Sequence, residues 1–374
     1  MSWRRGFSLT SLAALGLLAC QVIVGVGDET GEPRPGDGGT DTVDAGEEPD
    51  PCLKHHPPLP PSTTTAETPG ARFFAVKTFR LRPRDALPIG YDLDDRCTGT
   101  AGSTTSAAPC TSPNEGDPVV DDDGGVDNSF GRLLDTVRLV NPADDLAGEA
   151  FTTSAERGIF TFIVQVLGWN GEPNDERVSV AMITGTNLAS SGCGDAAVPG
   201  GRPRFDGCDR WDFSEDTPFT PEFGVAANGM DGYVTNGVLV ATDRKTPRSF
   251  GFGETTVTLH EPLLTARIVD DAGVPTLVDG VVTGRVAAST LLEFVYRLER
   301  DGGAFCDDPN TTALVRQFVC DRRDITLSRS DDGKGLGCDA VSFAFGFDAP
   351  ASFLGSPRSE PVKTCSGPLD TTCP

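Results

Sequence analysis

The chain has 374 residues, with 55 acidic against 31 basic side chains, so its formal net charge at pH 7 is -24. This charge excludes nucleic-acid binding through clustered lysine and arginine, and it excludes electrostatic docking on anionic lipid. The hydrophobic fraction of 37% belongs to a chain that can bury a core, but the composition does not indicate a biochemical activity.

Residues 1–19 have the order of an export signal: two arginines near the start precede an uncharged apolar stretch that is short for a membrane span. The stretch ends in the sequence LLAC at residues 17–20, which resembles the lipoprotein signal of bacteria. The resemblance implies cleavage before Cys20 and membrane attachment through a lipid on its sulfur. Because Gln21 follows, it also implies an outer-membrane or cell-surface location. An uncleaved signal anchor is the alternative, since the apolar run continues beyond the cysteine.

Residues 20–72 have the composition of a tether. Acidic residues outnumber basic ones, Gly, Pro and Thr are frequent, and large apolar side chains are rare, so this segment cannot bury a core of its own. We expect it to be disordered and to space the folded part away from the bilayer. His55 and His56 lie within it and are expected to be solvated linker residues rather than metal ligands.

Residues 73–374 are expected to form one extracytoplasmic, β-rich domain. Short apolar runs with the alternation or the β-branched content of strands dominate it, and Asn-Gly, Asp-Gly and Pro occur in the connections. Many short strands of this kind predict an antiparallel β-sandwich or jelly roll, and a division into two lobes near residues 190–210 stays open. The predicted strands are 73–81, 158–167, 177–183, 232–241, 254–259, 264–269, 277–284, 317–320 and 340–347.

The densest chemistry of the chain is acidic and lies in two runs, residues 91–95 and 121–128. A hard cation such as Ca²⁺ takes six to eight oxygen ligands, which Asp-rich loops with glycine turns can supply, although the spacing here is not that of an EF-hand. The alternative is a solvated acidic loop whose aspartates cap turns. The predicted ligands of a loop calcium site are Asp92, Asp94, Asp121, Asp123, Asp127 and Asn128.

The same two runs carry a resemblance. The sequence GYDLD at residues 90–94, followed after a cysteine-containing loop by GVDN at residues 125–128, is similar to a motif pair in uncharacterised lipoproteins of myxobacteria and related predatory bacteria. The resemblance covers about the first 60 residues of the folded part. It implies a secreted or surface location and brings no established activity.

The predicted strands 158–167 and 177–183 flank a polar tip, WNGEPND at residues 169–175, and therefore predict a hairpin. Trp169 at this tip is the aromatic residue best placed to contact a ligand. Its ring can instead fold back onto the sheet, and the sequence does not decide between the two positions.

One amphipathic helix is predicted at residues 286–300, where leucines and a valine recur on one face and Asp-Gly-Gly follows as a stop signal. A weaker helical pattern covers residues 130–137.

Cys20 is assigned to the lipid, which leaves ten cysteines, an even number. Disulfides are expected because an exported chain enters an oxidising compartment. The absence of a CxxC motif and the small number of histidines argue against a zinc site. The full connectivity stays open, but short spacings favour the local bridges Cys97–Cys110, Cys193–Cys208 and Cys306–Cys320.

Catalytic motifs are few: the sequence contains neither a Gly-x-Ser-x-Gly elbow nor a phosphate-binding Gly-x-x-x-x-Gly-Lys loop. Three functions remain. The first is a surface lipoprotein with a ligand-binding or adhesive domain, in which calcium could order a loop. The second is a structural envelope component that binds another protein, and the third is an exported hydrolase with a carboxylate pair. An exposed apolar patch would favour the second, and a cleft with two close carboxylates the third.

Overall fold

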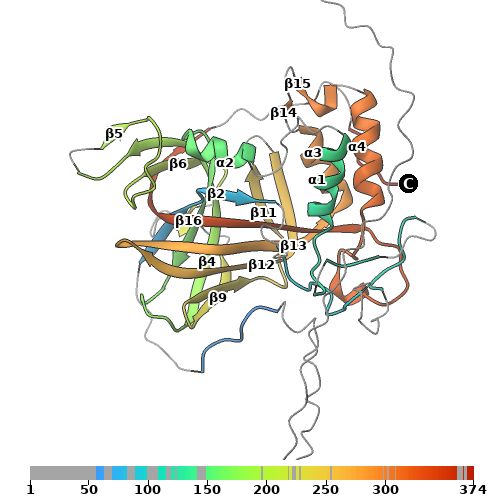
Figure 1. The fold of residues 1–374 in the computed structure, drawn as a ribbon, viewed down its shortest axis with the longest axis horizontal. Coiled ribbons are helices and arrows are strands. Elements are labelled where there is room, and N and C mark those ends of the chain that lie inside the picture. The colour runs from blue at the N-terminus through green and yellow to red at the C-terminus, as the bar shows by residue number, and fades with distance from the viewer. Residues whose placement is uncertain are drawn as a thin grey trace, which may run out of the picture. The chain divides into compact units, whose positions relative to one another are not determined.

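The computed structural model describes the greater part of the chain from residue 56 onward (Figure 1). The predicted signal peptide, Cys20, most of the predicted tether and Asp123 lie outside the described residues. The described residues are 56–62, 70–81, 89–98, 108–114, 119–122, 124–140, 149–194, 197–217, 219–220, 225–226, 229–252, 255–297, 299–300, 303–307, 309–359, 365 and 369–374.

The protein is mainly β, and eight antiparallel strands close into a barrel in the order β1-β3-β4-β9-β10-β12-β13-β16, with β16 pairing back onto β1. The prediction of an antiparallel β-rich domain is confirmed, but the strands form one closed sheet and not the two facing sheets of a sandwich or jelly roll. Strands on both sides of residues 190–210 belong to this barrel, since β4 pairs with β9. The bounds are β1 Ala71–Ala75, β3 Thr161–Leu167, β4 Asp175–Ser191, β9 Met230–Thr235, β10 Val238–Thr242, β12 Thr255–Asp271, β13 Val274–Ala287 and β16 Ala340–Arg358.

Closure depends on long strands that bend. The pairing of β12 with β13 shifts register between His260 and Leu263, and the pairing of β13 with β16 shifts between Leu277 and Gly280. Such bulges increase strand twist and curvature, which a sheet needs in order to close on itself. The sequence pattern divided β12 into two strands because Glu261 and a proline interrupt it. In the structure β12 continues through them, with Glu261 at a φ of 49°.

A second layer covers part of the barrel. Strand β6 (Arg210–Ser214) pairs antiparallel with β4 and parallel with β16. It brings Trp211, which is fully buried, against side chains of β1, β3 and β4. These barrel strands are therefore buried on both faces, which explains the nearly continuous apolar run of β3. The remaining short strands are β2 Thr78–Arg80, β5 Val198–Pro199, β7 Phe219–Thr220, β8 Val225–Ala226, β11 Arg248–Phe252, β14 Glu299–Arg300 and β15 Gly303–Ala304.

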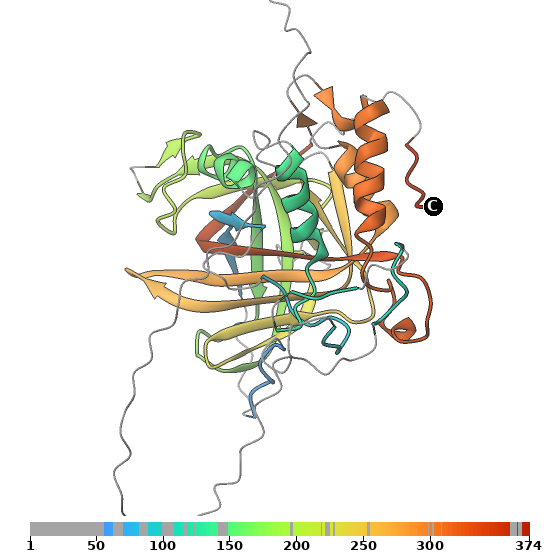
Figure 2. The same cartoon turned by 45° about the vertical axis from the view of Figure 1, so that its right-hand side comes forward.

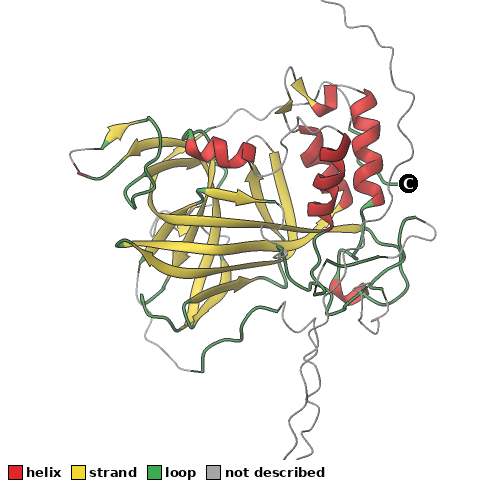
Figure 3. Ribbon diagram, in the orientation of Figure 1, coloured by secondary structure: helices red, strands yellow, loops and turns green. Residues whose placement is uncertain are grey.

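Helices α1, α3 and α4 gather at one side of the barrel (Figures 1, 2 and 3) and contribute side chains to the same core as the strands. None of the helices in the described ranges is long and apolar enough to cross a bilayer. The helices are α1 Ser129–Val140, α2 Glu149–Glu156, α3 Ala288–Arg297 and α4 Pro309–Asp321, with 3-10 turns η3 Phe305–Asp307 and η4 Arg329–Asp331.

The helix predictions are confirmed in place but not in extent. Helix α3 is shorter than the predicted 286–300, because the barrel strand β13 continues to Ala287 and β14 begins at Glu299. The strand predicted at residues 317–320 is wrong, since this segment lies in α4. A short apolar run does not separate strand from helix, and here Val315 and Val319, one helical turn apart, pack towards the core.

Between described residues, one local and three distant disulfide pairings are present. Cys193–Cys208 is bridged as predicted. The predicted Cys97–Cys110 and Cys306–Cys320 bridges are wrong: Cys97 and Cys110 are each disulfide-bonded, but not to one another, and neither are Cys306 and Cys320. Folding brings cysteines far apart in sequence together, so sequence spacing is a poor guide to pairing. The other bridges between described residues are Cys110–Cys338, Cys306–Cys365 and Cys320–Cys373.

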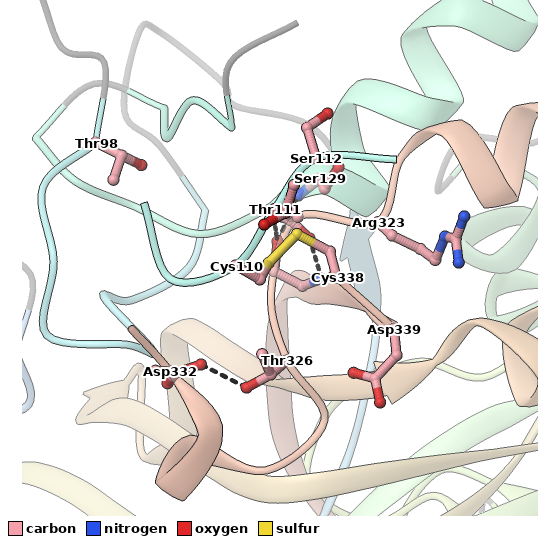
Figure 4. Close-up of a disulfide and its surroundings, with 12 residues drawn as sticks. Thr98, Cys110, Thr111, Ser112, Ser129, Arg323, Thr326, Asp332, Cys338 and Asp339 are labelled. Carbon is pink, nitrogen blue, oxygen red and sulfur yellow. Dashed lines mark hydrogen bonds between the residues drawn. A yellow bond between two sulfur atoms is a disulfide. The ribbon is translucent and has the colours of Figure 1, made fainter. Parts of the chain in front are cut away.

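We call the loops beside the start of β16 the loop cap, which comprises residues 89–98, 108–114, 119–122, 124–128 and 324–339. Regular structure is sparse there, and single bridges hold the loops together, such as Ile325 with Ala340 and Thr111 with Gly337. The Cys110–Cys338 disulfide joins the first half of the cap to the second (Figure 4).

Candidate functional site

Three carboxylates converge in the loop cap. Asp92 and Asp94 come from one predicted acidic run and Asp127 from the other, and one carboxylate oxygen of each lies within 4.8 Å of the others. All three residues are buried, with exposed fractions of 7%, 5% and 3%. The two runs that the sequence singled out therefore meet in space, across the intervening cysteine-containing loop.

The local backbone explains why these side chains converge. Leu93 is buried in a small apolar cluster with Ile325 and Ala340, which anchors the first run to the start of β16. Its backbone N–H donates to Asp127 Oδ2 at 2.7 Å. The two aspartates on either side of Leu93 are thereby held beside Asp127.

Asp121 lies next to this trio and is tied to a different loop. Its carboxylate accepts hydrogen bonds from the backbone N–H of Thr98 at 2.6 Å and from the Thr98 hydroxyl at 2.5 Å. The Asp121 N–H donates to the Thr98 carbonyl at 3.0 Å. Asp121 is therefore a fixed, buried charge at the border of the carboxylate trio.

Asn128, a predicted metal ligand, has a side chain that forms hydrogen bonds within the protein. Its Oδ1 accepts the backbone N–H of Gly131 at 3.0 Å, which caps the N-terminus of α1. Its Nδ2 donates to the Ile89 carbonyl at 2.9 Å. Both polar atoms of the side chain thus have hydrogen-bond partners in the protein, and Asn128 caps α1 directly after Asp127.

Burial and mutual repulsion make these carboxylates hard to ionise. Burial, together with the charges of Asp121, Asp92 and Asp332, raises the pKa of Asp94 to about 8. Burial raises the pKa of Asp127 well above its ordinary value, and neighbouring charges add to this. The pKa of Asp121 is raised to about 6 by burial, against the hydrogen bonds from Thr98. The group therefore either holds protons at neutral pH or needs a positive charge beside it.

Positive charge is scarce at this point. Among the described residues no ion pair involves Asp94, Asp121 or Asp127, and Asp92 meets only the imidazole of His56, at 3.8 Å. Asp94 Oδ1 accepts the Arg96 N–H at 2.8 Å, whereas Asp94 Oδ2 is buried with no hydrogen-bond donor in the described part of the chain. An unsatisfied buried carboxylate oxygen costs free energy, so it marks a position where a ligand would stabilise the fold.

A buried ion pair braces the cap from below. Arg285 on β13 has a fully buried side chain and binds both carboxylate oxygens of Asp332, at 3.0 and 2.6 Å. The same guanidinium donates to the carbonyls of Thr326 and Leu93, each at 2.7 Å. Arg285 thus joins the barrel wall to both halves of the cap, and Figure 4 shows the accompanying Thr326–Asp332 hydrogen bond.

A cavity of about 680 Å³ adjoins the carboxylates, a volume within the range of small-molecule sites. It lies between the cap, the start of α1 and the end of α4. Asp121 and Asp324 line it, together with Arg132, whose guanidinium is 3.6 Å from Asp324. Asp121 is therefore shared between the cavity wall and the border of the carboxylate trio.

Trp169 does not present its ring to solvent. It is 7% exposed, its indole N–H donates to the Glu172 carbonyl at 2.9 Å, and the Arg72 guanidinium lies 4.3 Å from its ring centroid. The hairpin between β3 and β4 exists as predicted, but its tryptophan packs back onto the barrel core. Of the two positions that the sequence left open for the Trp169 ring, the structure has the one folded back onto the sheet.

Sequence reasoning missed three residues of this region. Arg285 lies in an apolar strand pattern and Asp324 in a short polar segment, so neither carried a signal. The sequence predicts His56 to be a solvated linker residue because its neighbours are Pro-rich.

None of the protein-family models, curated proteins or solved structures matches the chain.

Proposed function

We propose that this protein is a lipid-anchored, extracytoplasmic binding domain whose loop cap holds a divalent cation between Asp92, Asp94 and Asp127. The barrel is the rigid support, and the cation orders the cap that forms one wall of the neighbouring cavity.

The disulfides support the extracytoplasmic location. Nine of the described cysteines are disulfide-bonded, a usage typical of exported proteins and rare in reducing compartments. The anchor is proposed from Cys20 in the LLAC sequence, and the surface location from that sequence and from the GYDLD and GVDN pair.

One observation supports the cation more than any other: the unpartnered, buried Oδ2 of Asp94 lies in a group of converging carboxylates. Three such groups repel one another at short range, and a cation coordinated by all of them removes the repulsion. A solvated acidic loop, the alternative, is expected to expose its carboxylates, whereas these are at least nine-tenths buried.

The oxygen ligands favour calcium among common divalent ions. The three carboxylates lie within 4.8 Å of one another, which accommodates Ca–O bonds of about 2.3–2.6 Å. Calcium also accepts irregular coordination and can complete its shell with backbone carbonyls and water. The role proposed for the cation is structural, since it replaces repulsion within the cap by shared bonds.

The cavity supports a binding role for the domain. Its wall includes Asp121, whose charge is felt by Asp94, so cation occupancy of the trio changes the electrostatics of the cavity as well as the order of its wall. Ligand affinity in the cavity is therefore expected to depend on the cation.

Thermal unfolding of the metal-free protein with and without Ca²⁺ tests this function. A ligand bound only by the folded state adds RT ln(1 + [L]/Kd), about 2.7 kcal/mol at a hundredfold excess over Kd. Asp94→Asn should lose this increment. Asp279→Asn, which removes one charge from an exposed side chain on β13, should keep it. An equal response of the wild type to Ca²⁺ and to sodium at matched ionic strength would remove the proposal.

An exported hydrolase is the second candidate, favoured by one observation. Asp121 and Asp324 line the cavity together, and burial raises the pKa of both, as expected for carboxyl groups that exchange protons. Asp324 accepts the N–H and hydroxyl of Ser342, which orients it. Turnover of chromogenic glycosides or esters that is lost in both Asp121→Asn and Asp324→Asn, with the fold retained, would support this candidate over a pure binding domain.

A further inference from the structure

The end of the tether contacts the domain at the carboxylate site. His56 Nε2 lies 3.8 Å from Asp92 Oδ2, and two residues further the Pro58 carbonyl accepts a hydrogen bond from the Tyr233 hydroxyl on β9. Leu59, the next residue, is 83% exposed and adds no apolar burial to these contacts. The imidazole therefore lies beside Asp92, at the border of the carboxylate trio.

The separation between His56 and Asp92 is informative. At 3.8 Å the two atoms are farther apart than the 2.7–3.2 Å of a hydrogen bond. Two ligands that each lie about 2.0–2.2 Å from one metal ion are roughly 3 to 4 Å apart, which includes the observed spacing. His56 is not among the ligand atoms of the trio that lie within 4.8 Å of one another, so its imidazole has to move towards Asp94 and Asp127 to share an ion with them. The His56 side chain is 38% exposed and can move in this way, whereas the Asp92 side chain is almost fully buried.

We infer that His56 supplies a nitrogen ligand when a borderline divalent ion such as Zn²⁺ occupies the carboxylate site. The inference rests on the proposed cation site. It adds the class of ion that the site distinguishes and the residue that recognises it.

The ligand chemistry separates two classes of ion. Calcium takes oxygen ligands, so it binds the three carboxylates and leaves His56 free. Zinc accepts imidazole nitrogen together with carboxylate oxygen, so it gains a ligand from His56. Zinc therefore holds the His56 imidazole beside Asp92, whereas calcium does not.

The chain offers a clean measurement, because it contains only three histidines. In the purified protein labelled at histidine, one equivalent of Zn²⁺ should shift the imidazole NMR signals of one residue, and His56→Gln should identify that residue. Calcium at saturation should leave all three imidazoles in place. His55→Gln is the matched control, since it removes the adjacent imidazole of the same segment.

Affinity provides the second measurement. His56→Gln should weaken Zn²⁺ binding about tenfold or more and change Ca²⁺ binding less than twofold, while His55→Gln should change neither. If Zn²⁺ binds in a manner that Asp94→Asn abolishes but the His56 signals do not move, the inference is overturned and the cation site stands. If neither ion binds in an Asp94-dependent manner, the cation site and the inference are both wrong.

Discussion

The barrel and the loop cap are stabilised by different physical means. In the barrel, apolar side chains such as Phe162, Phe345 and Val164 interdigitate in one large core, and backbone hydrogen bonds run from strand to strand. In the cap, the apolar cluster around Leu93 is small, and disulfides, capping bonds and buried charges replace it.

One chain therefore combines a part whose stability depends little on solution conditions with a part whose stability depends on them strongly. Burial of apolar area depends little on ions, protons or thiols, so the barrel should keep its stability across conditions. The stability that buried carboxylates and a disulfide give the cap depends on ions, protons and thiols together. Perturbations of pH, redox state and metal should therefore act on the cap first.

The largest expected effect is that of pH on the metal-free cap. The pKa of Asp94 is about 8 in the fold against 3.8 for an ordinary aspartate, so the folded state binds more protons between these values. The stability contributed by the protonated group is complete below about pH 4 and is lost as the pH rises through 8. At about 1.4 kcal/mol per unit the loss is on the order of 5 kcal/mol.

Urea unfolding at pH 5.5 and pH 8.5 measures the part of this loss that falls between pH 5.5 and 8, on the order of 3 kcal/mol. Saturating Ca²⁺ should flatten the pH dependence, and Asp94→Asn should reduce it, because Asp127 and Asp121 still titrate in the variant. A metal-free protein that is equally stable at both pH values would show that these carboxylates do not carry the conditional stability of the cap.

Removal of the brace should have the next largest effect. Arg285→Ala leaves Asp332 buried without its partner, at an expected cost of about 3–5 kcal/mol. Arg267→Ala, which breaks an exposed pair with Asp279, should cost less than about 1 kcal/mol. Similar costs for the two variants would mean that the Arg285 pair does not join the cap to the barrel.

Removal of a disulfide should lower the free energy of unfolding by about 2–4 kcal/mol, and only a disulfide of the cap should also affect Ca²⁺ binding. A Cys110→Ala/Cys338→Ala double variant should lose stability and also weaken Ca²⁺ binding, because this bridge joins the two halves of the cap. A Cys193→Ala/Cys208→Ala double variant is the control outside the cap and should keep its Ca²⁺ affinity. Equal Ca²⁺ affinities in both double variants would contradict the assignment of the site to the cap.

The smallest expected effect sharpens the role of Asn128. If Asn128 is a helix cap only, Asn128→Ala should lower the free energy of unfolding by about 1 kcal/mol and leave the Ca²⁺-induced rise in melting temperature unchanged. As a metal ligand it would lose that rise as well. Melting curves with and without Ca²⁺ decide between the two roles.

The sequence predicted the barrel strands better than their closure. Apolar runs with alternation or β-branched content identified β3, β4 and β16, because burial of a strand on one or both faces leaves such a pattern. Closure depends on bulges in β12 and β13, and a bulge appears in the sequence only as an interruption, such as that at Glu261. A sandwich and a barrel built from the same strands therefore look alike in the sequence.

The candidate site was also predicted only in part, because a sequence shows charge but not contacts between distant segments. Asp92, Asp94 and Asp127 stood out because uncompensated charge is visible in a sequence. The contributions of Arg285 and His56 depend on contacts between distant segments, with 192 residues between Arg285 and its partner carbonyl at Leu93. No local pattern records such a contact, and the same holds for the Cys110–Cys338 pairing over 228 residues.

The strand β16 has a consequence for when the barrel can form. It pairs with β13 and with β1, so Phe73 near the start of the folded part is opposite Ser352 near its end. A chain that emerges from its N-terminus cannot close the barrel until residues 340–358 have arrived, and loop closure over so many residues slows folding. Until then β1 and β13 each have one edge without a pairing strand. A chaperone that covers exposed strand edges could bind the incomplete chain there.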